Sequence, residues 1–241
     1  MLESRDGLAV SVSDGTVTLR LDRPPRNLLA PDLMGALRAT LLEADADADV
    51  RAIVLTGSGD AFCGGLDLER LQAGGNPVDF ASHLVEVLRV FPGLGKAVVA
   101  AVNGDALASG FSLVCAADLA VAVRGAKLGT FEASIGIWPM VAQVVPLQRL
   151  LPRHALQNVL TGVPFETERA AEIGVINEVV DASELEVTIA RYVELATRAG
   201  GALAAGRRAF YRLLEMSYDE ALTHALGQFA QMFEDQAAAR R

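Results

Sequence analysis

Two stretches of small residues, each placed at the end of a short apolar run, constrain this chain more than any other feature. DAFCGGLDL, residues 60–68, comes shortly after the run at 52–56, and AVNGDALASGFS, residues 101–112, ends the run at 97–102. The β-branched residues of the two runs predict buried strands, and both stretches lead into patterns that begin helices. Small residues at such a turn let a backbone N–H approach a ligand closely. Two such loops side by side can direct two N–H groups at one oxygen, as in an oxyanion hole.

Other interpretations of these loops remain open from spacing alone. Tight packing of a helix on a sheet requires the same small residues. A phosphate-binding loop is disfavoured, because Gly93, Gly95 and Lys96 lack the earlier glycine at Walker spacing and Ala97 replaces the required Ser or Thr. A serine hydrolase is also disfavoured, because Ser109 does not lie in a G-x-S-x-G turn.

Composition limits the class of protein. The chain has 241 residues, 51% of them hydrophobic and 21% charged, which predicts one large domain or a domain with a small appendage. A net charge of −9 argues against nucleic acid or an anionic membrane as the main partner. The beginning lacks a signal-peptide pattern, and Cys63 and Cys115 lie among small apolar residues, so we expect buried thiols in a cytoplasmic protein. The three histidines have no metal-ligand spacing, so no metal is expected.

Hydrophobic periodicity predicts alternating strands and helices. A hairpin around Asp14-Gly15 joins strands at 8–13 and 16–22. Repeated strand, strand, helix units favour an α/β spiral over a Rossmann sheet. The other predicted strands are 51–56, 97–102, 118–123 and 175–180; the predicted helices are 31–45, 66–71, 78–90, 108–116, 141–150, 153–160, 168–173, 183–199, 202–215 and 219–237.

Four motifs in order resemble the crotonase, or enoyl-CoA hydratase/isomerase, superfamily. They are LDRPPRN, AFCGGLDL, AVNGDALASGFSL and FEASIGIWP, and the resemblance runs from about residue 19 to 180, more loosely to about 235. It implies an α/β crotonase-like spiral of repeated β-β-α units. It also implies an acyl-CoA-binding core at 1–181 and a C-terminal helical region at 182–241 through which the chain assembles as a homotrimer or homohexamer.

The resemblance also implies where an acyl-CoA thioester binds. The backbone N–H groups of Leu66 and Ser109 would donate to the thioester carbonyl oxygen, each worth about 3 kcal/mol as charge develops there. Arg23 and Arg26 would lie beside the adenine and phosphates of coenzyme A, which is part of the substrate and not a separate cofactor. The full set of implied contacts is Arg23, Pro24, Arg26, Gly64, Gly65, Asp67, Leu68 and Gly110.

One departure from the family pattern concerns the acid–base groups. Hydratases of the family use two glutamates, which fall at positions 112 and 132, and here position 112 is Ser. The Ser112 hydroxyl is not a general base at neutral pH without a base beside it, so hydrogen bonding to water or backbone is its alternative role. Glu132 lies in an apolar stretch that includes Ile137 and Trp138, and desolvation there would raise its pKa.

One carboxylate suffices for isomerisation of a 3-enoyl-CoA to a 2-enoyl-CoA. The family's isomerases resemble this chain in having a carboxylate at the position of Glu132 and a non-acid at that of Ser112. The alternatives are a hydratase of restricted activity, another enolate reaction such as thioester hydrolysis or decarboxylation, and a non-catalytic acyl-CoA-binding protein.

Several further residues have two open interpretations. Asp67 and Asp118 are expected to brace backbone, whereas Lys96, Arg149 and Arg153 suit either structural ion pairs or phosphates of coenzyme A. Relatives also contact coenzyme A through an aromatic and a Lys in a later segment, and the candidates to replace these are Phe229, Phe233 and Arg240.

Overall fold

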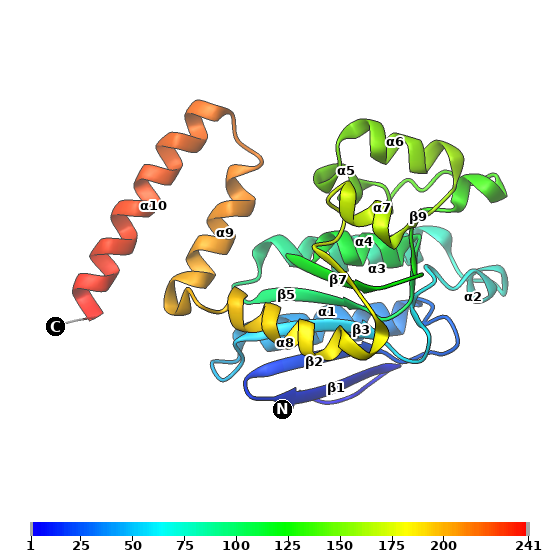
Figure 1. The fold of residues 1–241 in the computed structure, drawn as a ribbon, viewed down its shortest axis with the longest axis horizontal. Helices are drawn as coiled ribbons and strands as arrows, with labels where there is room; N and C mark the ends of the chain where they lie inside the picture. The colour runs from blue at the N-terminus through cyan, green and yellow to red at the C-terminus, as the bar shows by residue number, and fades with distance from the viewer. Residues whose placement is uncertain (1, 240–241) are drawn as a thin grey trace.

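The computed structural model describes residues 2–239, and their side chains up to Glu234, so the candidate contact Arg240 lies outside it. Figure 1 shows the arrangement of the elements. The strands are β1 (Leu8–Ser13), β2 (Thr16–Leu21), β3 (Ala52–Gly57), β4 (Ala61–Cys63), β5 (Ala97–Val102), β6 (Asp105–Leu107), β7 (Leu119–Val123), β8 (Lys127–Gly129), β9 (Phe165–Glu166) and β10 (Glu178–Val180). The α-helices are α1 (Pro31–Ala46), α2 (Leu68–Gln72), α3 (Pro77–Val90), α4 (Ser109–Ala116), α5 (Val144–Arg149), α6 (Pro152–Thr161), α7 (Thr167–Glu172), α8 (Leu185–Ala196), α9 (Leu203–Leu213) and α10 (Tyr218–Ala239).

The larger sheet has the strand order β1-β2-β3-β5-β7-β10. β1 and β2 form the predicted antiparallel hairpin, with both turn residues at positive φ, and the remaining pairs are parallel. Alternation along β3 divides its side chains between two cores, because Ile53 and Leu55 join the cluster that includes helices α1 and α3, whereas Val54 joins the cluster that includes α8. The sheet is therefore covered on both faces, as expected for parallel strands (Figure 1).

The smaller sheet has the order β4-β6-β8-β9, and its first three strands run parallel. None of these four strands is predicted, because each has only two or three residues, too few for a hydrophobic pattern. These segments are strands because each forms backbone hydrogen bonds with a neighbouring strand.

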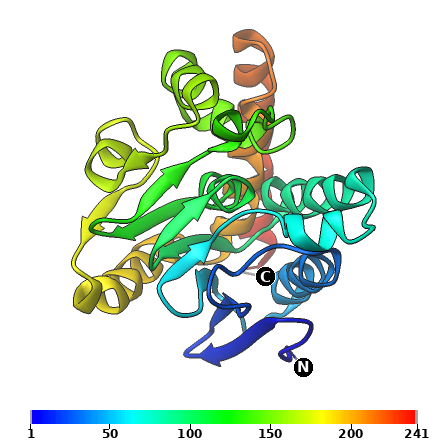
Figure 2. The same cartoon turned by 90° about the vertical axis from the view of Figure 1, so that its right-hand side faces the viewer.

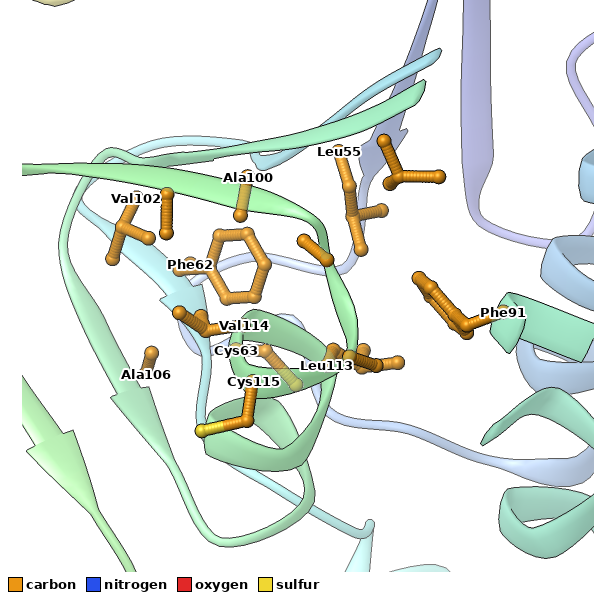
Figure 3. Packing of buried hydrophobic residues seen from close by; sticks show 14 of the residues in the cluster. Leu55, Phe62, Cys63, Phe91, Ala100, Val102, Ala106, Leu113, Val114 and Cys115 are labelled. Carbon is orange, nitrogen blue, oxygen red and sulfur yellow. The ribbon is translucent and has the colours of Figure 1, made fainter. Parts of the chain in front are cut away.

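Helix α4 packs where the two sheets meet, and all eight of its residues are buried. Figure 3 shows Val114 of this helix near Phe62 of β4, which also lies near Ala100 of β5. The small, apolar composition of α4 follows from this position, because a helix enclosed on every side has no polar face.

The C-terminal helices α9 and α10 stand at one side of the molecule, and α10 projects away from the core (Figures 1 and 2). A buried ion pair attaches α9: Arg207 Nε lies 2.8 Å from Asp118 Oδ2. The hydroxyl of Tyr211 donates to the other oxygen of Asp118, and Asp118 also accepts the N–H of Val98. Asp118 therefore braces backbone, as predicted, and also holds α9 in place.

Two predicted elements begin about three residues later in the structure. α5 begins at Val144 and not at 141, because turns from Pro139 occupy the preceding residues. β10 begins at Glu178 and not at 175, and the side chain of Asn177 bonds the backbone of Ala120 ahead of the ladder. The division at 181/182 stays a prediction; α8, which follows it, packs on the larger sheet. Within residues 2–239, no helix combines the length and apolar character needed to cross a membrane.

Candidate active site

The three predicted reactive positions follow three adjacent parallel strands. β4 leads to Leu66, β6 leads to Ser109 and β8 leads to Glu132. In the ladders Cys63 pairs with Ala106, and Leu107 pairs with Gly129. The carboxyl ends of parallel strands lie at one edge of their sheet, so the smaller sheet delivers all three segments to the same edge.

The two loops that carry the predicted donors are in direct contact. A Cβ added to Gly65 would lie 2.7 Å from the Cβ of Ala108 and 3.7 Å from the backbone nitrogen of Ser109. Gly65 also has φ +101°, which side chains rarely adopt. Within the described part of the chain, the N–H groups of Leu66 and Ser109 have no hydrogen-bond acceptor. Two unpaired donors therefore lie on neighbouring loops, which fits an oxyanion hole.

Ala108 has an unusual backbone conformation immediately before the second donor. Its φ is 53° and its ψ is −120°, and its N–H donates to the carbonyl of Gly129. An alanine at positive φ is strained by roughly 1–3 kcal/mol, and such strain occurs mainly at functional sites. This conformation could not be predicted from the sequence, because positive φ is common for glycine and rare for alanine.

Glu132 begins a short 3₁₀ turn, Glu132–Ile135, and is half-buried. Its Oε2 accepts the N–H of Phe131 at 2.9 Å. Burial raises the pKa of the Glu132 carboxyl and outweighs the opposing effect of backbone N–H groups. The direction agrees with the prediction, although Ile137 and Trp138 are themselves largely exposed in the single chain.

Ser112 lies one turn beyond Ser109 on α4 and is fully buried. Its hydroxyl donates to the carbonyl of Ala142 at 2.7 Å. The hydroxyl thus connects α4 to the segment before α5, and this backbone contact is the alternative that the sequence left open.

The LDRPPRN loop lies beside the first donor loop. The N–H of Gly64 donates to the backbone carbonyl of Arg26 at 2.7 Å. The N–H of Leu29 donates to the carbonyl of Gly65, and the carbonyl of Leu29 accepts the N–H of Asp67. The buried side chain of Asn27 donates to three carbonyls of the segment 58–62 and accepts the N–H of Arg23. The sequence suggested only a turn at Asn27, yet its amide fixes one loop against the other.

The two arginines of this loop differ in their surroundings. Arg23 donates to Asp32 at 2.7 Å and to the carbonyl of Asp6, and its guanidinium holds the pKa of Asp32 well below the ordinary range. Arg26 is 62% exposed and lies only loosely near Glu69, at 3.9 Å. Arg26 is therefore the arginine of this loop with an exposed and weakly paired charge.

The remaining implied contacts surround the first loop. Asp67 caps α2 by accepting the N–H of Arg70, a bracing role as predicted, and Leu68 begins that helix half-buried. Pro24 is exposed, whereas Gly110 is buried so closely against Cys63 that a Cβ would overlap it. Cys63 is a free thiol whose pKa burial raises to about 12, so it is unreactive.

Of the three basic side chains that suited either ion pairs or phosphates, two bond backbone carbonyls. Lys96 donates to the carbonyl of Val50, and Arg149 donates to the carbonyls of Cys115 and Ala117. Arg153 is exposed.

The described residues contain no group of three His, Cys, Asp or Glu side chains placed to hold a metal ion. A groove of about 780 Å³ between the larger sheet and α8 has none of the predicted site residues in its lining.

Comparison with known proteins gives one family. The family model described as Enoyl-CoA hydratase/isomerase matches residues 11–240. A carnitinyl-CoA dehydratase of Salmonella enteritidis PT4 is 34% identical over 84% of this chain and 79% of its own length. A probable peroxisomal enoyl-CoA hydratase 1 of Arabidopsis thaliana is 32% identical over 71% of this chain, which spans 65% of that relative.

The fold is shared with solved structures. The crystal structure of an enoyl-CoA hydratase from Mycobacterium smegmatis matches with a TM-score of 0.90 and 30% identity, over 96% of this chain and 92% of that one. A family protein from Silicibacter pomeroyi matches with a TM-score of 0.88 and 27% identity, over 94% and 98%. The chain belongs to the crotonase, or enoyl-CoA hydratase/isomerase, family.

Proposed function

We propose that this enzyme isomerises a 3-enoyl-CoA to a 2-enoyl-CoA with Glu132 as its single acid–base group. One observation carries the proposal: three adjacent parallel strands lead to one sheet edge that has a half-buried carboxylate and two N–H groups without an acceptor among the described residues. The position where hydratases of the family have a second glutamate is Ser112, whose hydroxyl is engaged by a backbone carbonyl.

The proposed mechanism has two proton transfers. The thioester carbonyl oxygen accepts the N–H groups of Leu66 and Ser109, and the Glu132 carboxylate removes a proton from C2. The electron pair left on C2 delocalises into the carbonyl and the 3,4 double bond, giving a dienolate whose oxygen the two donors stabilise. The Glu132 carboxylic acid then returns the same proton to C4, which leaves the double bond between C2 and C3. A raised pKa suits a group that acts first as base and then as acid.

Addition or removal of water is the second candidate reaction. It is favoured by the names of the relatives, an enoyl-CoA hydratase and a carnitinyl-CoA dehydratase. In that reaction Glu132 would act on a water, and a further group would have to replace the carboxylate missing at position 112.

Assay of the purified protein with 3-enoyl-CoA and 2-enoyl-CoA of medium chain length separates the candidates. We expect 2-enoyl-CoA to form without hydration, and Glu132→Gln to lower kcat by at least about a hundredfold, the lower range for loss of a general base. Glu166→Gln, which removes an exposed carboxylate from the neighbouring β9, is the control and should retain activity.

Three results would contradict this proposal. Rapid hydration would favour the second candidate, and unchanged turnover in Glu132→Gln would exclude Glu132 as the base. Binding of the thioester without any turnover would favour a non-catalytic acyl-CoA-binding protein.

We also propose that the chain assembles as a homotrimer or homohexamer through its C-terminal helices. The support is the exposure of apolar side chains along α10, where Leu226 is 70% and Phe229 is 58% exposed. Soluble proteins rarely leave such a contiguous apolar surface uncovered.

A further inference from the structure

A buried amide on α6 holds the segment that precedes Glu132. Asn158 is 2% exposed, and its Oδ1 accepts both the N–H and the hydroxyl of Thr130, each at 2.8 Å. Its Nδ2 donates to the carbonyl of Thr130 at 3.0 Å and to that of Val163 at 2.9 Å. These four bonds occupy both lone pairs and both hydrogens of the amide.

Three of the four bonds go to one residue, which is itself 1% exposed and lies two positions before Glu132. The end of α6 supports the same segment at a second place, because a Cβ on Gly162 would lie 2.7 Å from Ser134 N and 3.1 Å from Phe131 O. The backbone on both sides of Glu132 is thus held by one helix. The carboxylate is in turn bonded to the N–H of Phe131.

These bonds between Asn158 and Thr130, here called the clamp, have a structural role, because without the amide the buried N–H and carbonyl of Thr130 would each lose a hydrogen bond, at about 1–3 kcal/mol per group. The amide also fixes every polar group of Thr130 in one arrangement. Misplacing a catalytic group by about 1 Å lowers the rate by about a hundredfold, so such fixing bears directly on the chemistry.

We propose that Asn158 is a positioning residue for Glu132, acting through its hydrogen bonds to Thr130. The inference rests on the proposed function, in which Glu132 transfers the proton. Asn158 touches no substrate; it determines the place from which the carboxylate reaches C2 and C4.

The pH dependence of kcat/KM provides a second test of this role, because it reports the pKa of Glu132. Burial is the main influence on the Glu132 pKa, opposed by backbone N–H groups of Phe131 and of Glu132 itself. The charged or titratable side chains of the packed helix α6 are Arg153 and His154, both in its first turn. If the clamp is lost and the segment moves toward solvent, the pKa returns toward the ordinary range of glutamate and the acid limb of kcat/KM moves to lower pH.

The test compares three changes at the clamp with one control. Asn158→Leu removes the amide at similar volume, Thr130→Val removes one hydroxyl, and Thr130→Ser keeps that hydroxyl. Thr167→Val is the control, because Thr167 is fully buried and its hydroxyl bonds Gly125 and Glu168, away from the candidate site. Activity with 3-enoyl-CoA, its pH profile and thermal unfolding are measured for each.

We expect Asn158→Leu to lower kcat by about tenfold to a hundredfold, with KM within about threefold and the acid limb moved to lower pH. Thr130→Val should show the same pattern more weakly, and Thr130→Ser should recover most of the loss. Thr167→Val should alter thermal unfolding alone.

The proposal is overturned if folded Asn158→Leu keeps the wild-type kcat and pH profile. If that variant does not fold, Thr130→Val decides: a loss of stability without any change in kcat or the acid limb overturns the proposal. Glu132→Gln separates this failure from failure of the proposed function. If Glu132→Gln is inactive while the clamp variants are normal, only the positioning role is wrong; if Glu132→Gln is active, the proposed function is wrong.

Discussion

Arg23 and Arg26 lie three residues apart in one loop, yet only Arg26 has an exposed and weakly paired guanidinium. We predict that Arg26→Ala raises KM for an enoyl-CoA by about tenfold, the worth of one hydrogen bond to a charged group, with kcat little changed. The matched measurement uses the enoyl thioester of pantetheine, which lacks the nucleotide, and its KM should not respond to the substitution. An equal effect on both thioesters would place Arg26 away from the nucleotide.

The ionised carboxylate of Glu132 is predicted to lower the free energy of unfolding at neutral pH, because burial disfavours its charged form. In the unfolded chain its pKa is about 4.3, and folding raises it, so the folded state binds this proton more tightly. The resulting stabilisation is complete below about pH 4 and is lost as pH rises through the raised pKa. Glu132→Gln should therefore raise Tm at pH 7, and the difference should vanish near pH 4. A lower Tm at pH 7 would contradict the direction of this pKa shift.

Among the elements, α4 is wholly buried and tolerates little change. A Cβ on Gly110 would lie 2.7 Å from the Cβ of Cys63 and closer still to its carbonyl oxygen, so Gly110→Ala should destabilise the protein by about 1–3 kcal/mol and displace the Ser109 donor. Gly35 in α1 is the control: it is exposed with open space around it, and Gly35→Ala should stabilise by up to about 1 kcal/mol. Urea unfolding and kcat check both, and a stable, active Gly110→Ala would mean that the donor loop is placed differently.

The larger strands and helices follow from sequence because their signals are long. The apolar runs of β3 and β5 and the small-residue helix α4 appear near their predicted positions. β4 and β6 could not be predicted, since a three-residue strand exists only through its neighbours.

The candidate site also has features that the sequence predicts and features that it does not. The donor loops and Glu132 follow from motifs, whereas the positive φ of Ala108 and the bonds of Asn158 depend on contacts between distant segments. Such contacts leave no local pattern in the chain.

At the scale of the whole molecule, α10 projects away from the core (Figure 1), and its apolar side chains Leu226 and Phe229 are exposed. We predict that Leu226→Glu lowers the mass of the assembly in light scattering, because it places a charge where apolar contact is expected. Gln228→Glu, on the same helix and already polar, is the control and should leave the mass unchanged. A monomeric wild-type protein would contradict the proposed assembly.

The donors and the carboxylate rest on different supports, since Ser109 belongs to the enclosed helix α4 whereas the segment of Glu132 lies on α6. Mutations that reshape the second support can therefore change the direction of proton transfer while thioester polarisation is preserved. In evolutionary terms, such a chain can keep its means of activating a thioester while the proton-transfer part of the site is rebuilt for a new reaction. A library confined to residues 133–141 and 158 samples that route while keeping Glu132 and Ala142, whose carbonyl accepts the Ser112 hydroxyl of α4.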